Sequence, residues 1–336
     1  MRKQLFLFWA FSLSTFYISN AQNNFKIIHR IVVQGDGGWD YVAMDNANQH
    51  VFVSHGTQVN ILDASSAKEL AVIPNTKGVH GIAIANDLNK GFTSNGKDSS
   101  VTVFDLKTFA TTNKIYVTGK NPDAILYDDF SHRIFTFNGK GKNATVIDAA
   151  TEKVIGTIDM AGKPEFAVSN HAGKIYVNIE NKNEVVVIDA NLMKIEKRFS
   201  IAPGDEPSGL AMDVATNRLF SVCGNKMLIV SDALNGKVVA NLPIGDGADA
   251  VVFDEKTKNI FASNGEGTLT IVHEDGENAF RLIKTIQTQK GARTLALNPT
   301  THHLFLPVAE FEQGGDSEKK HKKIKPNSFE VLEMGE

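Results

Sequence analysis

The stretch KNPDAILYDDFSHRIFTFNGKGKNATVIDAATEKVIGTID, residues 120–159, decides the fold because its pattern returns along the chain. Residues 162–201 read GKPEFAVSNHAGKIYVNIENKNEVVVIDANLMKIEKRFSI and have the same order of features. Each copy begins with a turn that contains Pro or small residues, and four short apolar segments follow. Period-2 alternation and β-branched residues, as in ATVID, are typical of strands. Each copy therefore predicts four short strands.

The chain contains seven such copies. Aligning them on the residue that enters the first strand gives seven positions at steps of 40 to 44 residues, which we call the first ring. Four short strands in this length match one blade of a β-propeller. An α/β barrel would need helices between the strands, and no convincing amphipathic helix follows the N-terminal segment. We predict an all-β, seven-bladed β-propeller with four-stranded blades. The first ring is Asp40, His80, Asp123, Glu165, Ser208, Asp249 and Arg293.

The two ends of the chain are expected to meet in the last blade. The last copy ends at SFEVLEMGE, residues 328–336, which supplies its third strand and nothing after it. The segment FKIIHRIVV, residues 25–33, precedes the first copy as KVIGTID precedes the fourth. We therefore expect the N-terminal strand to complete the last blade and close the ring, which removes free sheet edges.

The first residues predict export. Arg2 and Lys3 precede the apolar run LFLFWAFSLSTFYI, residues 5–18, and the small residues SNA follow it. This order is typical of a signal peptide, and the run is short for a membrane span. We predict a signal peptide over residues 1–21 and one propeller domain over residues 22–336, in the periplasm or outside the cell. An uncleaved membrane anchor is the alternative, and after cleavage we expect no membrane span.

The charge and the cysteine content of the chain limit the classes of partner that we expect. Removing Arg2 and Lys3 changes the formal net charge from −3 to about −5, which disfavours nucleic acid. Cys223 is the only cysteine, so the chain has no intramolecular disulfide. We expect a monomer that is stabilised by packing.

The repeats resemble a known family, the YVTN-repeat propellers, also called YncE-like proteins. The resemblance rests on IYVTGKNP, residues 115–122, and on VIDA at the ends of third strands, and it covers nearly all of the chain after the signal peptide. It implies a seven-bladed fold and export. It implies little about activity, because members of the family differ in function.

A second ring lies 15 residues after the first ring in every copy, at the end of the second strand. Because the first two strands are antiparallel, we expect both rings to pair and to line one mouth of the central channel. Gly follows the second-ring residue in five copies, and tight-turn chemistry is the simpler explanation of those Asn-Gly steps. The second ring is His55, Asn95, Asn138, Glu180, Cys223, Asn264 and Val308.

The expected funnel is acidic. Crowded carboxylates raise one another's pKa or bind a cation. The alternative is structural: each carboxylate would accept hydrogen bonds from backbone N–H groups and so hold neighbouring blades together. We expect Glu165 and Glu180 to be neighbours, and oxygen-rich ligation suits Ca²⁺, Mg²⁺ or Mn²⁺, so this pair is the candidate metal site. Five carboxylates oppose Arg293 in this set: Asp40, Asp123, Glu165, Glu180 and Asp249.

Aromatic residues and a long insertion accompany the rings. Trp39 and Tyr41 flank Asp40, and Phe166 follows Glu165, which suits either stacking on a ligand or core packing. Residues 309–328, AEFEQGGDSEKKHKKIKPNS, interrupt the last blade. Such a charged segment is usually a solvated loop, and the alternative is a basic cap over the funnel with Glu310 and Glu312 beside Arg293.

Three functions remain open. The leading hypothesis is an exported propeller that binds a small polar molecule, a peptide or a metal ion in the acidic funnel, without covalent catalysis. The alternative is a metal-dependent hydrolase or lactonase, in which His80 or Asp123 acts as general base and Arg293 stabilises an oxyanion. The third is a scaffold for protein partners, because propellers serve many functions.

Overall fold

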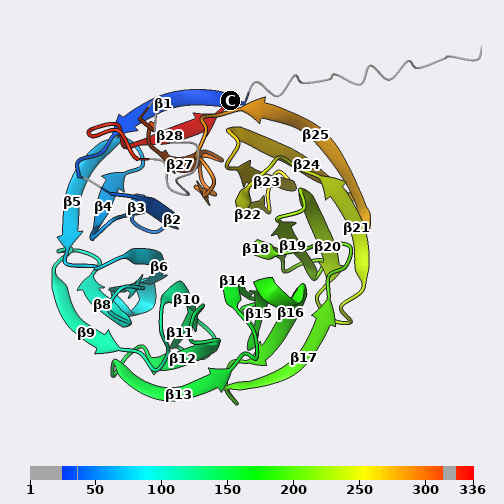
Figure 1. The fold of residues 1–336 in the computed structure, drawn as a ribbon, viewed down its shortest axis with the longest axis horizontal. Helices are drawn as coiled ribbons and strands as arrows, with labels where there is room; N and C mark the ends of the chain where they lie inside the picture. The colour runs from blue at the N-terminus through cyan, green and yellow to red at the C-terminus, as the bar shows by residue number, and fades with distance from the viewer. Residues whose placement is uncertain (1–24, 36, 313–322) are drawn as a thin grey trace, which may run out of the picture.

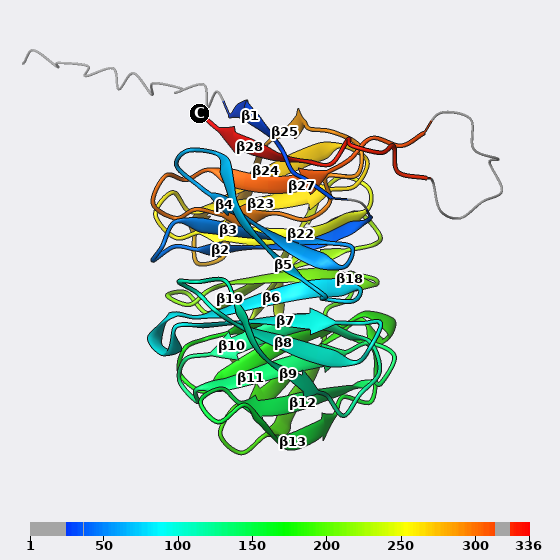
Figure 2. The same cartoon turned by 90° about the vertical axis from the view of Figure 1, so that its left-hand side faces the viewer.

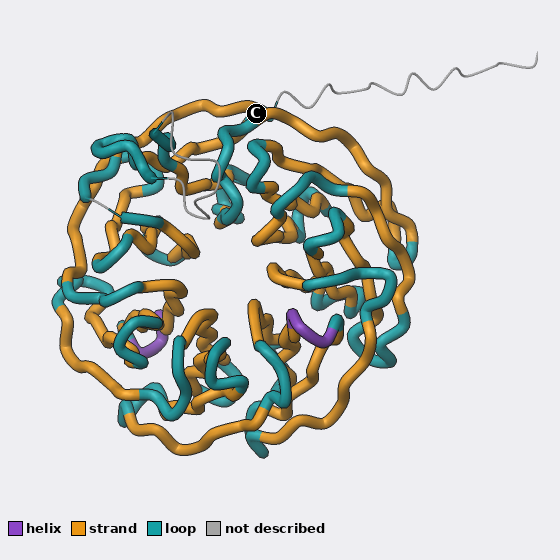
Figure 3. The backbone as a smooth tube through the Cα atoms, viewed as in Figure 1, coloured by secondary structure: helices purple, strands orange, loops and turns teal. Residues whose placement is uncertain are grey.

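The structure is a computed structural model that describes residues 25–35, 37–312 and 323–336. These residues form seven four-stranded antiparallel sheets, arranged as blades around a central axis (Figure 1). Between the strands lie turns and two short 3₁₀ helices, η1 (Asn86–Leu88) and η2 (Glu180–Lys182), as Figure 3 shows. The prediction of an all-β, seven-bladed β-propeller is confirmed. The predicted signal peptide lies outside the described residues.

Six blades take their strands consecutively along the chain, from the innermost strand outward. The first two blades are β2 (Trp39–Asp45), β3 (His50–His55), β4 (Gln58–Asp63) and β5 (Lys68–Pro74), then β6 (Val79–Ala85), β7 (Lys90–Asn95), β8 (Ser100–Asp105) and β9 (Thr111–Tyr116). The next two are β10 (Pro122–Asp128), β11 (Arg133–Asn138), β12 (Asn143–Asp148) and β13 (Lys153–Asp159), then β14 (Pro164–Ser169), β15 (Lys174–Ile179), β16 (Glu184–Asp189) and β17 (Lys194–Ser200). The fifth and sixth are β18 (Pro207–Asp213), β19 (Arg218–Cys223), β20 (Met227–Asp232) and β21 (Val238–Pro243), then β22 (Ala248–Asp254), β23 (Asn259–Asn264), β24 (Thr268–Gly276) and β25 (Ala279–Gln287).

The seventh blade joins the two ends of the chain, as the sequence predicts. Its order from the inside is β26 (Ala296–Leu297), β27 (Leu304–Val308), β28 (Glu330–Gly335) and β1 (Lys26–Val32). β1 runs antiparallel to β28 from the pair Lys26–Gly335 to the pair Val32–Glu330. The N-terminal strand therefore closes the ring.

The core lies between neighbouring blades, and an aromatic residue in each second strand supplies much of it. These side chains recur at the same position of the repeat and are at most 3% exposed. Burying an aromatic side chain stabilises a fold by about 1.5–3 kcal/mol relative to leaving it exposed. Each copy of the repeat thus contributes the same contact to the ring. The seven are Phe52, Phe92, Phe135, Tyr176, Phe220, Phe261 and Phe305.

The insertion leaves the last blade between β27 and β28 (Figure 2). Its described base is a short two-stranded ladder, in which Phe311 pairs with Ile324. Glu310 and Glu312 form ion pairs with Lys325 at 2.7 Å and Lys323 at 2.9 Å. The ion pairs of these two glutamates among the described residues are therefore with lysines of the insertion itself, and the expectation that they complete the ring beside Arg293 stays a prediction. Residues 313–322, where the cap was expected, lie outside the described residues.

Candidate functional site

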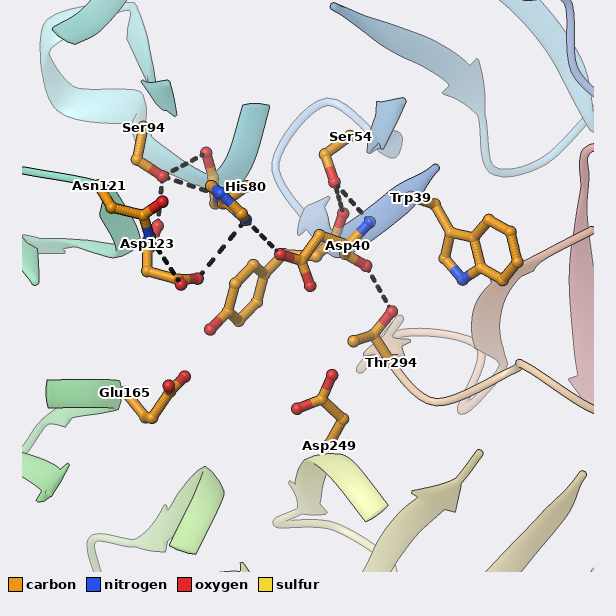
Figure 4. A network of polar contacts seen from close by, with 12 residues as sticks. Trp39, Asp40, Ser54, His80, Ser94, Asn121, Asp123, Glu165, Asp249 and Thr294 are labelled. Atoms are coloured by element: carbon orange, nitrogen blue, oxygen red, sulfur yellow. Dashed lines mark hydrogen bonds and ion pairs between the residues drawn. The ribbon is translucent and has the colours of Figure 1, made fainter. Parts of the chain in front are cut away.

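The first-ring residues lie at β-bulges of the innermost strands. In β2 the pairing with β3 shifts between Trp39 and Val42, so Asp40 and Tyr41 have no regular partner. The corresponding shift surrounds the first-ring residue in the five blades that follow. A bulge bends the strand and redirects the side chain at the inserted position. Figure 4 shows the result: the side chains of Asp40, His80, Asp123, Glu165 and Asp249 face a common space.

Buried hydroxyl groups satisfy the backbone that the bulges leave unpaired. The Ser54 hydroxyl accepts a hydrogen bond from the N–H of Asp40 and donates to the carbonyl of Tyr41 (Figure 4). In the second blade, the Ser94 hydroxyl accepts from the N–H of Gly81 and donates to the carbonyl of Asp123 in the next blade. Buried backbone polar groups need such partners. The bulges are therefore held in place rather than loosely ordered.

The same type of bond links three further pairs of neighbouring blades at the level of the first ring. Ser263 donates to the carbonyl of Arg293 at 2.6 Å, and Asn178 donates to the carbonyl of Ser208 at 3.0 Å. Thr294 of the last blade donates to the carbonyl of Asp40 at 2.5 Å, which joins the last blade to the first. Each bond fixes the backbone of a first-ring residue from the neighbouring blade.

One network of charges crosses the mouth of the channel. Nδ1 of His80 lies 2.5 Å from Oδ2 of Asp40. Arg293 pairs with Oδ1 of Asp40 at 3.3 Å through Nη2 and with Oδ2 of Asp249 at 2.7 Å through Nε. Burial lowers the pKa of His80, but the hydrogen bond to Asp40 and the charge of Asp123 outweigh it, so the pKa is raised. The imidazole can therefore carry a positive charge near neutral pH.

Asp123 is the least compensated acid of the first ring. Its contacts among the described residues are His80 Nδ1 at 3.7 Å and the amide of Asn121 at 3.4 Å, with no Lys or Arg within 4 Å. Burial raises its pKa to about 6, and the charges of Asp40 and Asp249 add to this while His80 opposes it. A largely buried carboxylate whose nearest cation is an imidazole 3.7 Å away, shared with Asp40, is only partly compensated. This side chain is thus poised to accept a proton or a cation.

Glu165 and Glu180 lie together, as predicted, but an ammonium group lies between them. Nζ of Lys163 is 2.7 Å from Oε1 of Glu165 and also contacts Glu180. Burial, followed by the charge of Asp123 and the hydrogen bond with Glu180, raises the pKa of Glu165 to about 9. Burial opposes ionisation of Glu180, but its hydrogen bonds with Glu165 and Lys163 lower its pKa. The structure therefore puts a lysine where the sequence predicts a metal ion.

The expected pairing of the two rings is wrong by one residue. His55 is paired with Trp39 rather than Asp40, and Asn138 with Pro122 rather than Asp123. Because side chains alternate along a strand, a difference of one residue turns the second ring away from the channel. Apart from Glu180, the second-ring residues are at most 1% exposed and lie inside the blades: His55, Asn95, Asn138, Cys223, Asn264 and Val308.

The buried asparagines of the second ring fasten their own blades. Asn138 donates to Asn143 at 2.8 Å and to Thr145 at 3.0 Å, and accepts from Thr136 at 3.1 Å. Asn95 and Asn264 make equivalent bonds from the second strand to the third. Their role is structural, which agrees with the simpler explanation of the Asn-Gly steps. Cys223 is a buried thiol whose pKa burial raises to about 12.

Two glycines make room for the first ring. A Cβ atom on Gly96 would lie 2.6 Å from Nε2 of His80, so only glycine leaves space for the imidazole. A Cβ atom on Gly81 would lie 2.9 Å from Ile125 and 3.2 Å from the carbonyl of Asp123. Glycine at these positions is needed for close approach of neighbouring groups, since neither has a positive φ.

A cavity of about 510 Å³ follows the innermost strands along the central axis, and the first-ring residues themselves are not part of its lining. Its lining starts with the residues just after the first ring, among them Tyr41, Ile82, Ala124 and Phe166, and ends at Glu255 and neighbouring residues of the opposite mouth. The rings of Tyr41 and Phe166 pack together with centroids 5.4 Å apart. Trp39, by contrast, is buried against Phe311 and Phe329, away from a free rim. The funnel is therefore a charged mouth on a largely apolar channel.

Three side chains are arranged so that they could hold a metal ion. Ligand atoms of Asp40, His80 and Asp123 all lie within 4.8 Å of one another among the described residues. Two carboxylates and one imidazole form a donor set that suits several divalent ions. His80 and Asp40 already share a hydrogen bond, so an ion would have to displace that contact.

Comparisons with known proteins define the fold. No family model matches the chain, and no curated protein matches its sequence. A chain of the mitotic checkpoint complex superimposes with a TM-score of 0.75 at 13% identity, covering 100% of this chain and 99% of that chain. The RRP9 WD40 repeats give 0.76 at 9% identity, covering 94% and 98%. A chain of Kuenenia stuttgartiensis hydrazine synthase gives 0.71 at 16% identity, covering 89% and 97%. Such low identities show a shared seven-bladed propeller architecture and nothing about activity.

Proposed function

We propose that this chain is an exported binding propeller that holds a small polar ligand at the first ring. The observation that carries the proposal is the gathering of Asp40, His80, Asp123, Glu165 and Asp249 around a common space, next to a cavity of ligand size whose lining starts at the following residues of the same strands. Concave sites with a few converging polar groups are the usual form of small-molecule sites. Export is inferred from the first 21 residues, and the resemblance to YVTN-repeat propellers agrees with it.

The pKa values of the first-ring acids favour a role in ligand binding over a purely structural role in holding the blades together. Blade-to-blade contacts at this level are already made by hydroxyl and amide groups such as Ser94, Ser263 and Thr294. Acids that only fastened blades would be fully paired and would have lowered pKa values. Asp123, Glu165 and Asp249 instead have raised pKa values, with burial as the main cause. Strongly perturbed groups in a cleft are typical of functional sites.

A thermal-shift screen of small polar molecules, short peptides and divalent cations tests the proposal. Ligands that stabilise the mature protein should lose their effect in Arg293→Gln and Asp123→Asn variants. Arg281→Gln is the matched control, because Arg281 lies in the outermost strand of its blade and pairs only with nearby Asp275. Ligands whose stabilisation persists in both ring variants would contradict a site at the first ring.

A metal-dependent hydrolase or lactonase is the second candidate. The donor set of Asp40, His80 and Asp123 favours it, in place of the predicted pair of Glu165 and Glu180. A bound divalent ion would polarise a carbonyl or activate water. Metal analysis of the purified protein, followed by lactone hydrolysis with added Mn²⁺ or Ca²⁺, tests this candidate. Activity that is abolished in His80→Gln but retained in the exposed-site variant His132→Gln would favour it; absence of metal-dependent activity would refute it.

A protein partner is the third candidate. Seven-bladed propellers of the same architecture occur in the mitotic checkpoint complex and in U3-55K, so the fold is compatible with partner binding. No helix in the described part of the chain is long and apolar enough to cross a membrane. Partners captured by the wild-type protein and lost in Arg293→Gln would extend the first-ring proposal from small ligands to peptides.

A further inference from the structure

We propose that the cavity adjoining the first ring binds a small organic ammonium ion. Its nitrogen would lie between Asp123 and Glu165, and its apolar part would extend past Tyr41 and Phe166 into the channel. This inference rests on the proposed function, because it assigns a chemical class to the ligand of the same site.

The charged groups at the mouth leave negative charge poorly compensated on one side only, the side of Asp123. Asp40 and Asp249 already pair with Arg293, and His80 also contacts Asp40. On the opposite side, Asp123 has only the longer contact to His80 at 3.7 Å, which His80 shares with Asp40, and no ion pair with Lys or Arg among the residues that the structure describes. An added cation would therefore be attracted to the side of Asp123 rather than to the side of Arg293.

Glu165 faces the same space and reinforces this attraction. It has one cation, Lys163, which it shares with Glu180. The charge of Asp123 is the second cause, after burial, of its raised pKa, so these two carboxyl groups interact across the mouth. A cation bound between these two carboxyl groups would relieve the repulsion between them.

The walls next to these acids suit an organic cation better than a hydrated ion. Tyr41 and Phe166 adjoin Asp40 and Glu165 in sequence, line the cavity and pack against each other. An aromatic face attracts an ammonium group electrostatically, most strongly where water is excluded. Beyond them the lining consists mainly of Val, Ile, Leu and Ala side chains, such as Ile82, Ala124 and Val251. The site thus offers negative charge at its mouth and apolar contact along its wall.

The volume limits the size of the ligand. About 510 Å³ accommodates a molecule of the size of a substituted aromatic amine and lies within the usual range of small-molecule pockets. The charge at one end and the apolar wall along the axis predict the order of binding: nitrogen at the first ring, and the apolar part toward the opposite mouth.

Calorimetric titration with three probes of one shape tests the inference. Benzylamine carries a positive charge, benzyl alcohol none and benzoate a negative one. We expect benzylamine alone to bind, and its affinity to fall about tenfold or more in Asp123→Asn. Phe166→Leu, which keeps an apolar side chain, should weaken binding several-fold and serves if Asp123→Asn folds poorly. Arg281→Gln, in the outermost strand of its blade and outside the cavity lining, should leave the affinity unchanged.

The outcomes separate this inference from the proposed function. Binding of benzyl alcohol or benzoate that is lost in Arg293→Gln or Asp123→Asn would overturn the ammonium assignment and leave the first ring as the site. Binding of Mn²⁺ or Ca²⁺ alone, lost in His80→Gln, would also overturn it in favour of a metal. Benzylamine binding that none of the ring variants changes would overturn both.

Discussion

Replacing Glu165 by glutamine should stabilise the protein increasingly as the pH rises. The pKa of Glu165 is raised from 4.5 to about 9, so above pH 4.5 the folded protein holds a proton that the unfolded chain has released. Folding must then take up this proton, and the stability of the wild type falls with rising pH until about pH 9. Because glutamine resembles the protonated side chain at every pH, the variant should not show this loss of stability as the pH rises.

The size of the effect follows from the linkage between proton binding and folding. One proton corresponds to about 1.4 kcal/mol for each pH unit, or ~2.8 kcal/mol between pH 6 and pH 8. Glu180 and Asp123 interact with Glu165 and take part of this change, so we expect the advantage of Glu165→Gln to grow by about 2 kcal/mol over this range.

Urea unfolding at pH 6, 7 and 8 measures the effect directly. The matched control is Glu255→Gln, an exposed side chain at the opposite mouth, which should follow the wild type at all three pH values. A difference between Glu165→Gln and wild type that stays constant from pH 6 to pH 8 would refute the assignment of the buried proton to Glu165.

Three further predictions concern the structure around the first ring. Asp40→Asn should lower the pKa of His80, because it removes both a hydrogen bond and a charge that raise it; an unchanged imidazole titration by NMR would be inconsistent with the contact. Gly81→Ala should destabilise the fold by about 1–3 kcal/mol through overpacking, whereas Gly139→Ala, whose Cβ would have no neighbour nearer than 3.7 Å, should have little effect on urea unfolding. Asn138→Ala should cost about 2–3 kcal/mol, because it leaves the buried hydroxyl of Thr136 without its acceptor and removes the bond to Thr145, yet it should leave the titration of His80 unchanged; a shifted His80 titration would place Asn138 at the mouth after all.

The repeat made the fold predictable because every copy repeats the same physical requirements. The aromatic residue of the second strand and the polar turns recur at nearly constant steps, so blade number and ring closure follow from counting. The position of the first ring at the strand entrance was predictable for the same reason. Asp40, His80, Asp123, Glu165 and Asp249 do meet at one mouth.

The direction in which each side chain points could not be predicted from the repeat length. A β-bulge inserts one residue and changes which side chain faces the channel, and nothing in the first strands, such as PDAILYD, marks it. The second ring was therefore assigned to the wrong side of its strand. One signal was available in the recurrent Ser before the second-ring residue, in SHG at residues 54–56 and SNG at residues 94–96 and 263–265. Those serines hold the bulges.

The net negative charge at the mouth is smaller than the sequence predicts, for a simpler reason. Lys163 stands two residues before Glu165 and outside the repeat position, so alignment of the copies did not include it. Its ammonium group neutralises the pair of Glu165 and Glu180. The excess of negative charge is thereby confined to the side of Asp123, where we propose that the ammonium group binds.

Crystals grown with 4-bromobenzylamine would show most directly whether the first ring and its channel form a ligand site. The anomalous signal of bromine locates the probe without reference to any assumed pose. We expect one strong peak inside the channel, beyond Tyr41 and Phe166, with density for the ammonium group next to Asp123. A peak only on the outer strands, or a channel without a peak in crystals where calorimetry shows binding, would contradict it.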